Sequence, residues 1–245
     1  MISCNTKQKA DLIIHNAIIY TVDSIFSIAE AMAVKDGRII DVGTSDAILN
    51  SYDGSEIINV NNKPVYPGFI DAHCHFLGYG LSIQKVDLIN TKSFEEVIQR
   101  VVLHHKLNPS HWIIGRGWDQ NDWTVKEFPE KDTLDKLFPD NPVFLTRIDG
   151  HAALVNQKAW DMVKISSQNV IKGGEVVMKN GNFTGILIDN AMDYVSKLIP
   201  EPSENEKTTA LINAQKSCFA VGLTSVDDAG LELEDINLID SLQKN

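Results

Sequence analysis

Two histidines separated by one residue give the sharpest chemical signal in the sequence. His73 and His75 close an apolar run that covers residues 67–72. Alternate side chains of a β-strand share a face, so both imidazoles would project to one side, with their Cα atoms about 7 Å apart. Imidazole nitrogens bind zinc at about 2.0–2.1 Å, so the pair predicts the first half of a metal site. A hydrogen-bonded pair that binds no metal is the alternative.

The residues around this pair have separate expected roles. Cys74 would point to the opposite face of the strand, away from the imidazoles. Asp71 has the same parity as the histidines and would suit an acceptor that orients a metal ligand, although a structural role fits equally well. The metal ligands predicted from the residues are therefore the two histidines alone.

The elements that must position these residues change character along the chain. Short β-like runs fill residues 11–64 and are separated by turn formers such as Asp36-Gly37, which predicts hairpins in a small sheet. After Pro67-Gly68, apolar runs alternate with amphipathic stretches, which is typical of a parallel α/β domain.

The strands and helices expected after residue 67 can be placed individually. Helices are predicted over 93–105, with Ser93 as N-cap, and over 204–221, closed by Gly222, and a loop over 118–138 carries one short helix near 133–137. Strands are predicted over 68–73, 112–117, 143–148, 186–189 and 223–226.

Composition excludes several classes of protein. The 245 residues carry a net charge of −11, which argues against nucleic acid as a partner because such binders need a clustered basic surface. Three cysteines are too few for a disulfide framework or a paired-cysteine zinc site. No apolar run reaches the ~20 residues of a membrane helix, so we expect no transmembrane segment and a soluble, cytoplasmic protein.

The N-terminus offers a different localisation. Ile2-Ser3-Cys4, followed by a polar stretch, resembles the end of a bacterial lipoprotein signal whose apolar part is missing. Lipid anchoring or a periplasmic location through Cys4 is therefore the alternative to an ordinary polar N-terminus.

Several motifs, taken in order, resemble a known family. Three early segments are similar to the amidohydrolase superfamily: DLIIHNA at 11–17, VKDGRI at 34–39 and PGFIDAHCH at 67–75. Later segments resemble one branch, the amidohydrolase-3 group related to N-substituted formamide deformylases: GRGWD at 115–119, PVFL at 142–145, RIDGH at 147–151 with Asn156, GIL at 185–187 and GLTSV at 222–226.

This resemblance implies a fold. Members are (β/α)8 TIM barrels whose metal lies at the C-terminal ends of the strands, flanked by a small β-sandwich built from both ends of the chain. The expected fold class is therefore α/β, a partial metal-dependent hydrolase barrel preceded by a β-sandwich segment. The expected divisions are a tail over 1–10, the sandwich segment over 11–64 and the first part of the barrel over 65–245.

The resemblance also implies roles for residues at later strand ends. His151 follows the strand 143–148, where catalytic loops are expected, and we predict a contact with the substrate or transition state rather than a solvated loop histidine. Asp189 lies where many members place a metal-bridging acidic group, often a carboxylated lysine; N-capping of a helix is the alternative. Asp227 and Asp228 stand where relatives often carry a histidine, and they could bind zinc or cap a helix.

Three side chains of the loop after residue 117 are candidates for substrate binding. Trp118, Asp119 and Trp123 would line the pocket, because aromatic surfaces bind organic substrates while they exclude water. Trp112 and Trp160 are expected to be packing residues, and His15, His104, His105 and His111 to be surface or structural residues.

The implied reaction is hydrolysis of a carbon–nitrogen bond in a small amide-type molecule by a metal-activated water, with one or two divalent ions, most naturally zinc. A catalytic zinc needs three protein ligands, and the sequence supplies two convincing ones. We therefore expect an N-terminal part of an enzyme that is inactive alone, and exposed barrel edges that favour a homo-oligomer. A non-catalytic metal-binding or interaction module, and an unrelated α/β protein with an incidental histidine pair, are the alternatives.

Overall fold

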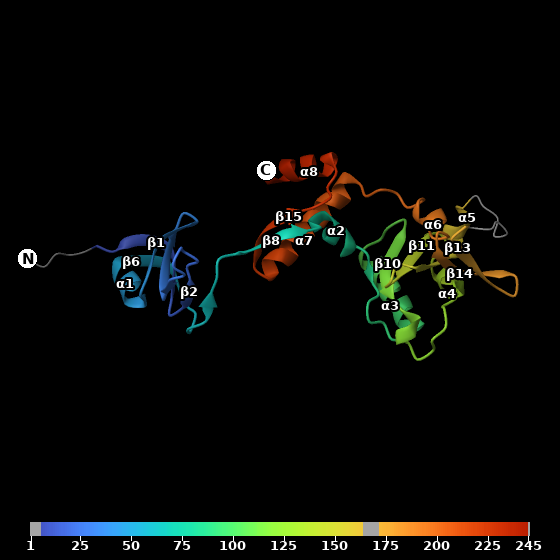
Figure 1. The fold of residues 1–245 in the computed structure, drawn as a ribbon, viewed down its shortest axis with the longest axis horizontal. Coiled ribbons are helices and arrows are strands. Elements are labelled where there is room, and N and C mark those ends of the chain that lie inside the picture. Colours follow the sequence, from blue (N-terminus) through green and yellow to red (C-terminus); the bar gives the residue numbers. More distant parts are fainter. Residues whose placement is uncertain (1–5, 164–171, 245) are drawn as a thin grey trace, which may run out of the picture. The chain divides into compact units, whose positions relative to one another are not determined.

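The computed structural model describes residues 6–163 and 172–244, and Figure 1 draws its elements. The chain divides into two compact units, one of residues 1–74 with 218–227 and one of residues 75–217 with 228–245. No helix in the described ranges combines the length and apolar character needed to cross a membrane. Cys4, the site of the alternative lipid anchor, lies outside the described residues.

Two small sheets and one helix form most of the first unit. The larger sheet has the strand order β5-β4-β1-β6 and the smaller one β3-β2-β7. The elements are β1 (Gln8–His15), β2 (Ile18–Tyr20), β3 (Ile28–Ala29), β4 (Ala31–Lys35), β5 (Arg38–Gly43), α1 (Ser45–Ser51), β6 (Tyr52–Asn59) and β7 (Pro64–Val65). The predicted turn at Asp36-Gly37 joins antiparallel β4 and β5, with φ of 50° and 70°.

Helix α1 was not expected from the sequence. Its first turn is capped by Thr44, whose hydroxyl accepts the Ala47 N–H at 3.3 Å, and Ile48 packs into the core of the larger sheet with 1% exposure. Seven residues make only two turns, too few for a hydrophobic period that distinguishes a helix from a strand.

Strands β8 (Phe69–Cys74) and β15 (Leu223–Asp228) form a separate two-stranded sheet, as the runs 68–73 and 223–226 predict. The Phe69 N–H donates to the Gly222 carbonyl at 2.8 Å. A Cβ at Gly68 would lie 2.2 Å from the Thr224 hydroxyl oxygen, so only glycine allows the two strands to approach so closely.

The second unit is built on a six-stranded sheet with the order β13-β14-β12-β11-β10-β9. Its strands are β9 (Val86–Asp87), β10 (Ile113–Trp118), β11 (Val143–Arg147), β12 (Ala152–Val155), β13 (Gly174–Lys179) and β14 (Asn182–Asp189). The helices are α2 (Phe76–Ser82), α3 (Phe94–Leu107), α4 (Asp132–Leu137), α5 (Gln157–Asp161), α6 (Asp193–Ser196), α7 (Glu204–Ala220) and α8 (Leu233–Gln243), with a 3-10 turn at Gln120–Asp122. As predicted, Ser93 caps α3 and accepts the Glu96 N–H.

The expectation of a parallel sheet is only partly correct. β9, β10 and β11 are parallel, whereas β12 pairs antiparallel with both β11 and β14, and β13 pairs antiparallel with β14. Only residues 148–151 connect β11 to β12. A parallel crossover needs a dozen or more residues, so this short link forces a hairpin and the fold is a mixed α/β sheet.

Both faces of this sheet are buried. Leu145, Leu154 and Ile186 belong to one hydrophobic cluster, and their chain neighbours Phe144 and Leu187 to a second one. Because side chains alternate across a strand, the two clusters lie on opposite faces. Because both faces of the sheet are covered, neighbouring residues of a strand are buried, and these strands form apolar runs in the sequence.

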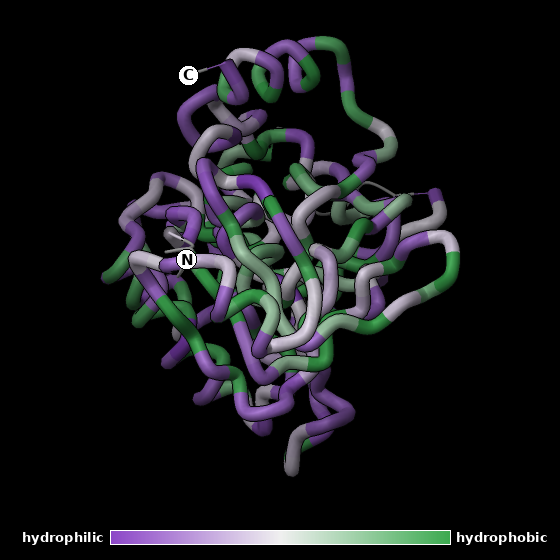
Figure 2. Tube along the Cα trace, turned by 90° about the vertical axis from the view of Figure 1, so that its left-hand side faces the viewer, coloured by the Kyte–Doolittle hydropathy of each residue, from purple (hydrophilic) through white to green (hydrophobic). Residues whose placement is uncertain are grey.

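The short helix α2 packs closely on α7. A third cluster joins Leu77 of α2 to Ala210 and Leu211 of α7, and Leu238 of α8 packs against it. Apolar and polar residues alternate along α8, the helix beside the C-terminus in Figure 2. Gly80 is buried at the α2–α7 contact, where an added Cβ would lie 2.4 Å from the Ala210 carbonyl oxygen.

We expect Gly80→Ala to lower the free energy of unfolding by about 1–3 kcal/mol, because the backbone of α7 must move to admit the methyl group. The matched control is Gly78→Ala in the same helix, where the new Cβ would meet only the His75 Cβ at 3.6 Å. This control should be neutral or stabilising by up to about 1 kcal/mol. Urea unfolding of both variants measures the difference, and equal stabilities would contradict the close contact.

Candidate active site

His73 lies in β8, as expected, and is exposed. Its backbone N–H donates to the Asp71 carboxylate at 3.1 Å. This bond uses the main chain of His73 and ties the carboxylate to the end of the strand, which is the structural role considered for Asp71. An interaction of Asp71 with the His73 ring stays a prediction.

His75 lies just beyond the strand rather than within it. β8 ends at Cys74, and His75 is the N-cap of α2 with φ −125° and ψ 71°. Its ring Nδ1 is 2.8 Å from the Ala229 carbonyl oxygen. A carbonyl oxygen can only accept, so the hydrogen of this bond lies on Nδ1. Histidines that bind metals commonly donate their other ring N–H to a carbonyl in this way.

Asp228 caps the helix that His75 begins. One carboxylate oxygen of Asp228 accepts the Leu77 N–H at 2.9 Å, although the two residues are 151 positions apart. The helix-capping alternative considered for Asp227 and Asp228 therefore holds for Asp228, but the helix is α2 and not the one that follows. The carboxylate satisfies one of the free N–H groups at the start of α2.

The structure brings together two candidate residues that were selected independently of each other. His151 comes directly before β12 and Asp189 ends β14, and His151 Nδ1 is 2.8 Å from an Asp189 carboxylate oxygen. Their side chains are 70% and 48% exposed. Asp189 was also considered as a helix N-cap, but the N-cap of the nearby α6 is Met192. The geometry instead makes Asp189 the hydrogen-bond acceptor of an imidazole.

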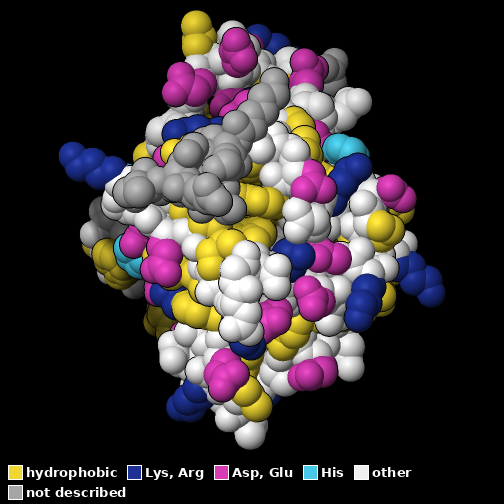
Figure 3. Space-filling model, turned by 90° about the vertical axis from the view of Figure 1, so that its right-hand side faces the viewer, with side chains coloured by type: hydrophobic (Ala, Val, Ile, Leu, Met, Phe, Trp, Pro, Cys, Tyr) yellow, Lys and Arg dark blue, Asp and Glu magenta, His cyan; other side chains and the backbone are white. Residues whose placement is uncertain are grey.

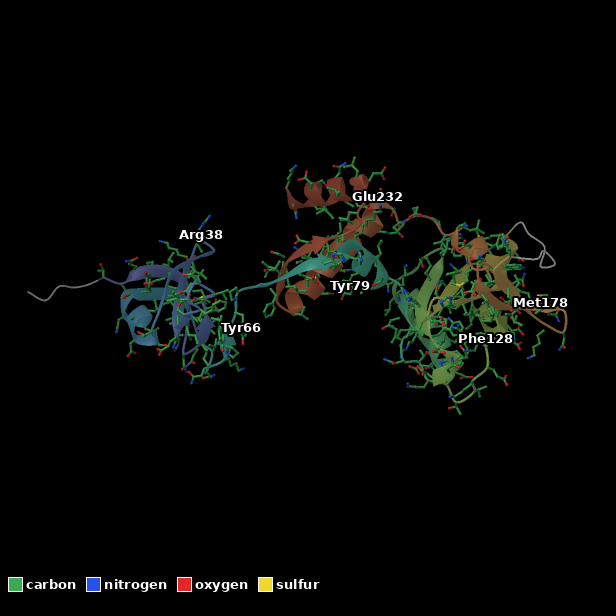
Figure 4. The ribbon with its side chains drawn as sticks, viewed as in Figure 1. Arg38, Tyr66, Tyr79, Phe128, Met178 and Glu232 are labelled. Carbon is green, nitrogen blue, oxygen red and sulfur yellow. The ribbon has the colours of Figure 1, made fainter. Side chains whose placement is uncertain are left out.

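Two residues that precede His151 hold its backbone. Arg147 binds Asp149 through two hydrogen bonds of 2.9 and 2.7 Å, and Asp149 accepts the His151 N–H at 3.0 Å. The Arg147 hydrogen bond lowers the pKa of the Asp149 carboxyl. The Arg147 guanidinium also lies 5.7 Å from the ring centre of Phe128, which Figure 4 labels.

No role was expected for Arg147 and Asp149, although the spacing of the residues contains a signal. Aspartate side chains often accept the N–H two residues further on, and Asp149-Gly150-His151 has that spacing. Gly150 has a φ of 80°, which favours glycine at the turn.

The expected pocket-lining role of Trp118 and Trp123 is corrected. Both belong to a hydrophobic core cluster and are 1% and 5% exposed. An indole can be buried whole when its N–H finds an acceptor, and Trp118 Nε1 donates to the Leu145 carbonyl at 2.8 Å. Asp119 accepts two hydrogen bonds from Asn121, and its contact with a substrate stays a prediction.

A complete metal site is not found in the described ranges. Within residues 6–163 and 172–244, no group of three or more His, Cys, Asp or Glu residues is placed to hold an ion. The donor chemistry of His75 fits a metal ligand because its ring hydrogen is fixed on Nδ1 by Ala229. Metal binding by His73 and His75 stays a prediction.

Comparison with known proteins supports the resemblance seen in the motifs. A protein LONG AFTER FAR-RED 3 from Arabidopsis thaliana is 37% identical over 90% of this chain and 38% of its own length. An N-substituted formamide deformylase from Arthrobacter pascens is 31% identical over 91% of this chain and 43% of its own length. The chain thus spans less than half the length of these two curated relatives.

A solved structure and a family model agree with these relatives. The crystal structure of an uncharacterized metal-dependent hydrolase from Pyrococcus furiosus superposes with a TM-score of 0.68 and 27% identity, over 95% of this chain and 47% of that one. The model of the amidohydrolase family Amidohydro_3 matches residues 56–245, well over half of the chain. The chain therefore belongs to the amidohydrolase family.

Proposed function

We propose that the chain is the N-terminal part of a metal-dependent hydrolase that cleaves non-peptide carbon–nitrogen bonds in small amide-type molecules. Family membership and the similarity to an N-substituted formamide deformylase support the reaction class. The observation that carries the proposal is the hydrogen bond of 2.8 Å between His75 Nδ1 and the Ala229 carbonyl, the kind of bond by which metal-binding histidines are commonly oriented.

His73 and His75 would hold the ion, and zinc suits two imidazole ligands. A bound zinc would lower the pKa of its water toward about 7 and would polarise the scissile carbonyl. The chain itself orients His75 through Ala229 and anchors α2 through Asp228. The proposed site holds one or two ions.

The architecture proposed for the whole protein is a (β/α)8 barrel with a β-sandwich, of which residues 65–245 and 11–64 are the first parts. β8 supports this proposal, because Phe69 and Ile70 are 53% and 71% exposed on the strand that contains His73, a proposed metal ligand. Apolar strand faces normally pack against another layer. Further barrel strands would cover Phe69 and Ile70 in the whole protein. The alternative is that a second copy of the chain covers them.

The proposed substrate is a small molecule and not a nucleic acid. The net charge is −11, and acidic side chains are interspersed with lysines and arginines on the face drawn in Figure 3. A polyanion would need a gathered basic surface.

A second function, a non-catalytic metal-binding or interaction module on an amidohydrolase scaffold, is favoured by one observation. The residues that the structure describes supply only a partial ligand set. Such a module would bind a metal or a partner without turnover.

Amine release tests the proposed function. With zinc supplied, the 245-residue chain should release no measurable amine from N-substituted formamides and other amides, because its ligand set is incomplete. A chain extended along the reading frame after the codon for Asn245 should turn over at about 1 s⁻¹ or faster, and His73→Ala in that chain should abolish turnover. Robust turnover by the 245-residue chain would contradict the fragment proposal. A zinc-loaded extended chain without turnover would favour the non-catalytic module.

A further inference from the structure

We propose that Asp189 is a positioning residue that fixes His151 in the Nδ1–H tautomer, so that Nε2 of His151 serves as a proton acceptor. The first argument is the contact itself: His151 Nδ1 is 2.8 Å from a carboxylate oxygen of Asp189. An ionised carboxylate has no hydrogen to donate. The hydrogen must therefore lie on Nδ1, and the lone pair of a neutral ring lies on Nε2.

The backbone around this pair is held at both residues. The Asp189 N–H donates to the His151 carbonyl at 3.1 Å, next to the pairing of Ala152 with Ile188 in the β12–β14 ladder. On the other side, the His151 N–H donates to Asp149, which Arg147 binds with two hydrogen bonds. These hydrogen bonds fix the backbone at His151 and at Asp189, from which the two side chains extend. A fixed backbone is required for a fixed orientation of the imidazole.

Asp189 also has an unusual backbone conformation. Its φ is 48°, in the left-handed region that non-glycine residues seldom adopt. Such a conformation persists only where the surroundings impose it. Here it accompanies the turn from the end of β14, which Figure 1 labels, to Ala191, whose N–H bonds the Ile188 carbonyl.

The chemistry that this arrangement offers rests on the proposed function. When water adds to an amide carbon, a carbon–oxygen bond forms and the water loses a proton, which Nε2 of His151 can take. The resulting imidazolium is stabilised by the negative charge of Asp189. When the carbon–nitrogen bond breaks, the same proton passes to the leaving nitrogen, and His151 returns to its neutral form.

The tautomer can be measured without substrate or metal. The 245-residue chain is labelled with ¹⁵N in its histidine rings and studied by NMR at about pH 8.5, well above the ordinary imidazole pKa of about 6.5. His151→Gln assigns the signals. We expect a protonated Nδ1 and an unprotonated Nε2 for His151, whereas a histidine without such a partner favours the opposite tautomer.

Two substitutions separate the effect of the Asp189 carboxylate from the effect of the Asp189 backbone conformation. Asp189→Gly removes the side chain but tolerates the positive φ, and should convert His151 to mainly Nε2–H. Asp189→Asn keeps an oxygen acceptor, also tolerates this φ, and should retain at least part of the Nδ1–H form. His75 is the internal reference, because its Nδ1–H is held by Ala229 and should not change in either variant.

The outcomes distinguish the two proposals. A wild-type His151 that is mainly Nε2–H, or an unchanged tautomer in Asp189→Gly while His75 keeps its signals, would overturn the positioning role. If the tautomer shifts as expected and the extended chain hydrolyses no amide, the positioning role stands and the hydrolase function fails.

Discussion

Zinc binding by the chain should fall by more than about 100-fold when His73 and His75 are both replaced by alanine. Loss of a residue that merely orients a metal ligand costs about 10–100-fold in affinity, and this double substitution removes the ligands themselves. Calorimetry or competition with a coloured chelator, at a pH where imidazoles are neutral, measures the affinity. The single variants should each lose most of the binding.

The control for this experiment removes the same number of histidines elsewhere. His15→Ala/His111→Ala leaves the histidine content equal to that of the test variant, and His111 is exposed and outside any strand or helix. Cys74→Ser tests the residue between the two proposed ligands, since a thiolate is also a zinc ligand. Equal zinc affinity in the test variant and the histidine control would show that His73 and His75 do not bind the ion. Loss of binding in Cys74→Ser would show that the Cys74 thiolate is a ligand.

Two strands with apolar runs were predictable to within one residue at each end, whereas the strand predicted over 186–189 begins four residues earlier, at Asn182. The runs 112–117 and 143–148 correspond to β10 (Ile113–Trp118) and β11 (Val143–Arg147), and Ser93 caps α3 as its spacing to Glu96 indicates. Burial on both sheet faces explains this success, because neighbouring positions of such a strand are both buried and therefore mostly apolar.

Pairing between strands was not predictable in the same way. β12 (Ala152–Val155) follows a polar turn and contains only four residues, and its antiparallel partners are fixed by the short link from β11. Trp118 shows a related limit: the sequence places it in a loop with charged neighbours, whereas the bond from its indole N–H to the Leu145 carbonyl allows complete burial. Both outcomes depend on a partner that local spacing does not reveal.

The candidate site shows the same division between local and long-range information. The spacing of His73 and His75 made both histidines candidate metal ligands. The carbonyl that orients His75 comes from Ala229, 154 residues later, and was not predictable from that spacing. His151 and Asp189 were each selected as the end residue of a strand, and only the β12–β14 ladder shows that they meet. Residue type could be inferred from the sequence, but the hydrogen-bonding partner required the fold.

A substitution at one buried amide side chain should have the largest effect on stability. Asn156 is fully buried, and its side chain makes four hydrogen bonds of 2.9–3.1 Å. The carbonyl oxygen accepts the N–H groups of Val143 and Ala159, and the amide nitrogen donates to the carbonyls of Phe138 and Asn141. One side chain thus joins the start of β11, the start of α5 and the end of α4.

Asn156→Ala should lower the free energy of unfolding by about 3–5 kcal/mol, because each main-chain group left buried without a partner costs about 1–3 kcal/mol. The melting temperature should fall by about 10 °C. Asn156→Asp keeps the acceptor but loses both donated bonds, so it should also be destabilising. Asn237→Ala, at an exposed position of α8, is the matched control and should change stability by less than about 0.5 kcal/mol. A loss below about 1 kcal/mol in Asn156→Ala would mean that water replaces the amide and that this junction does not depend on it.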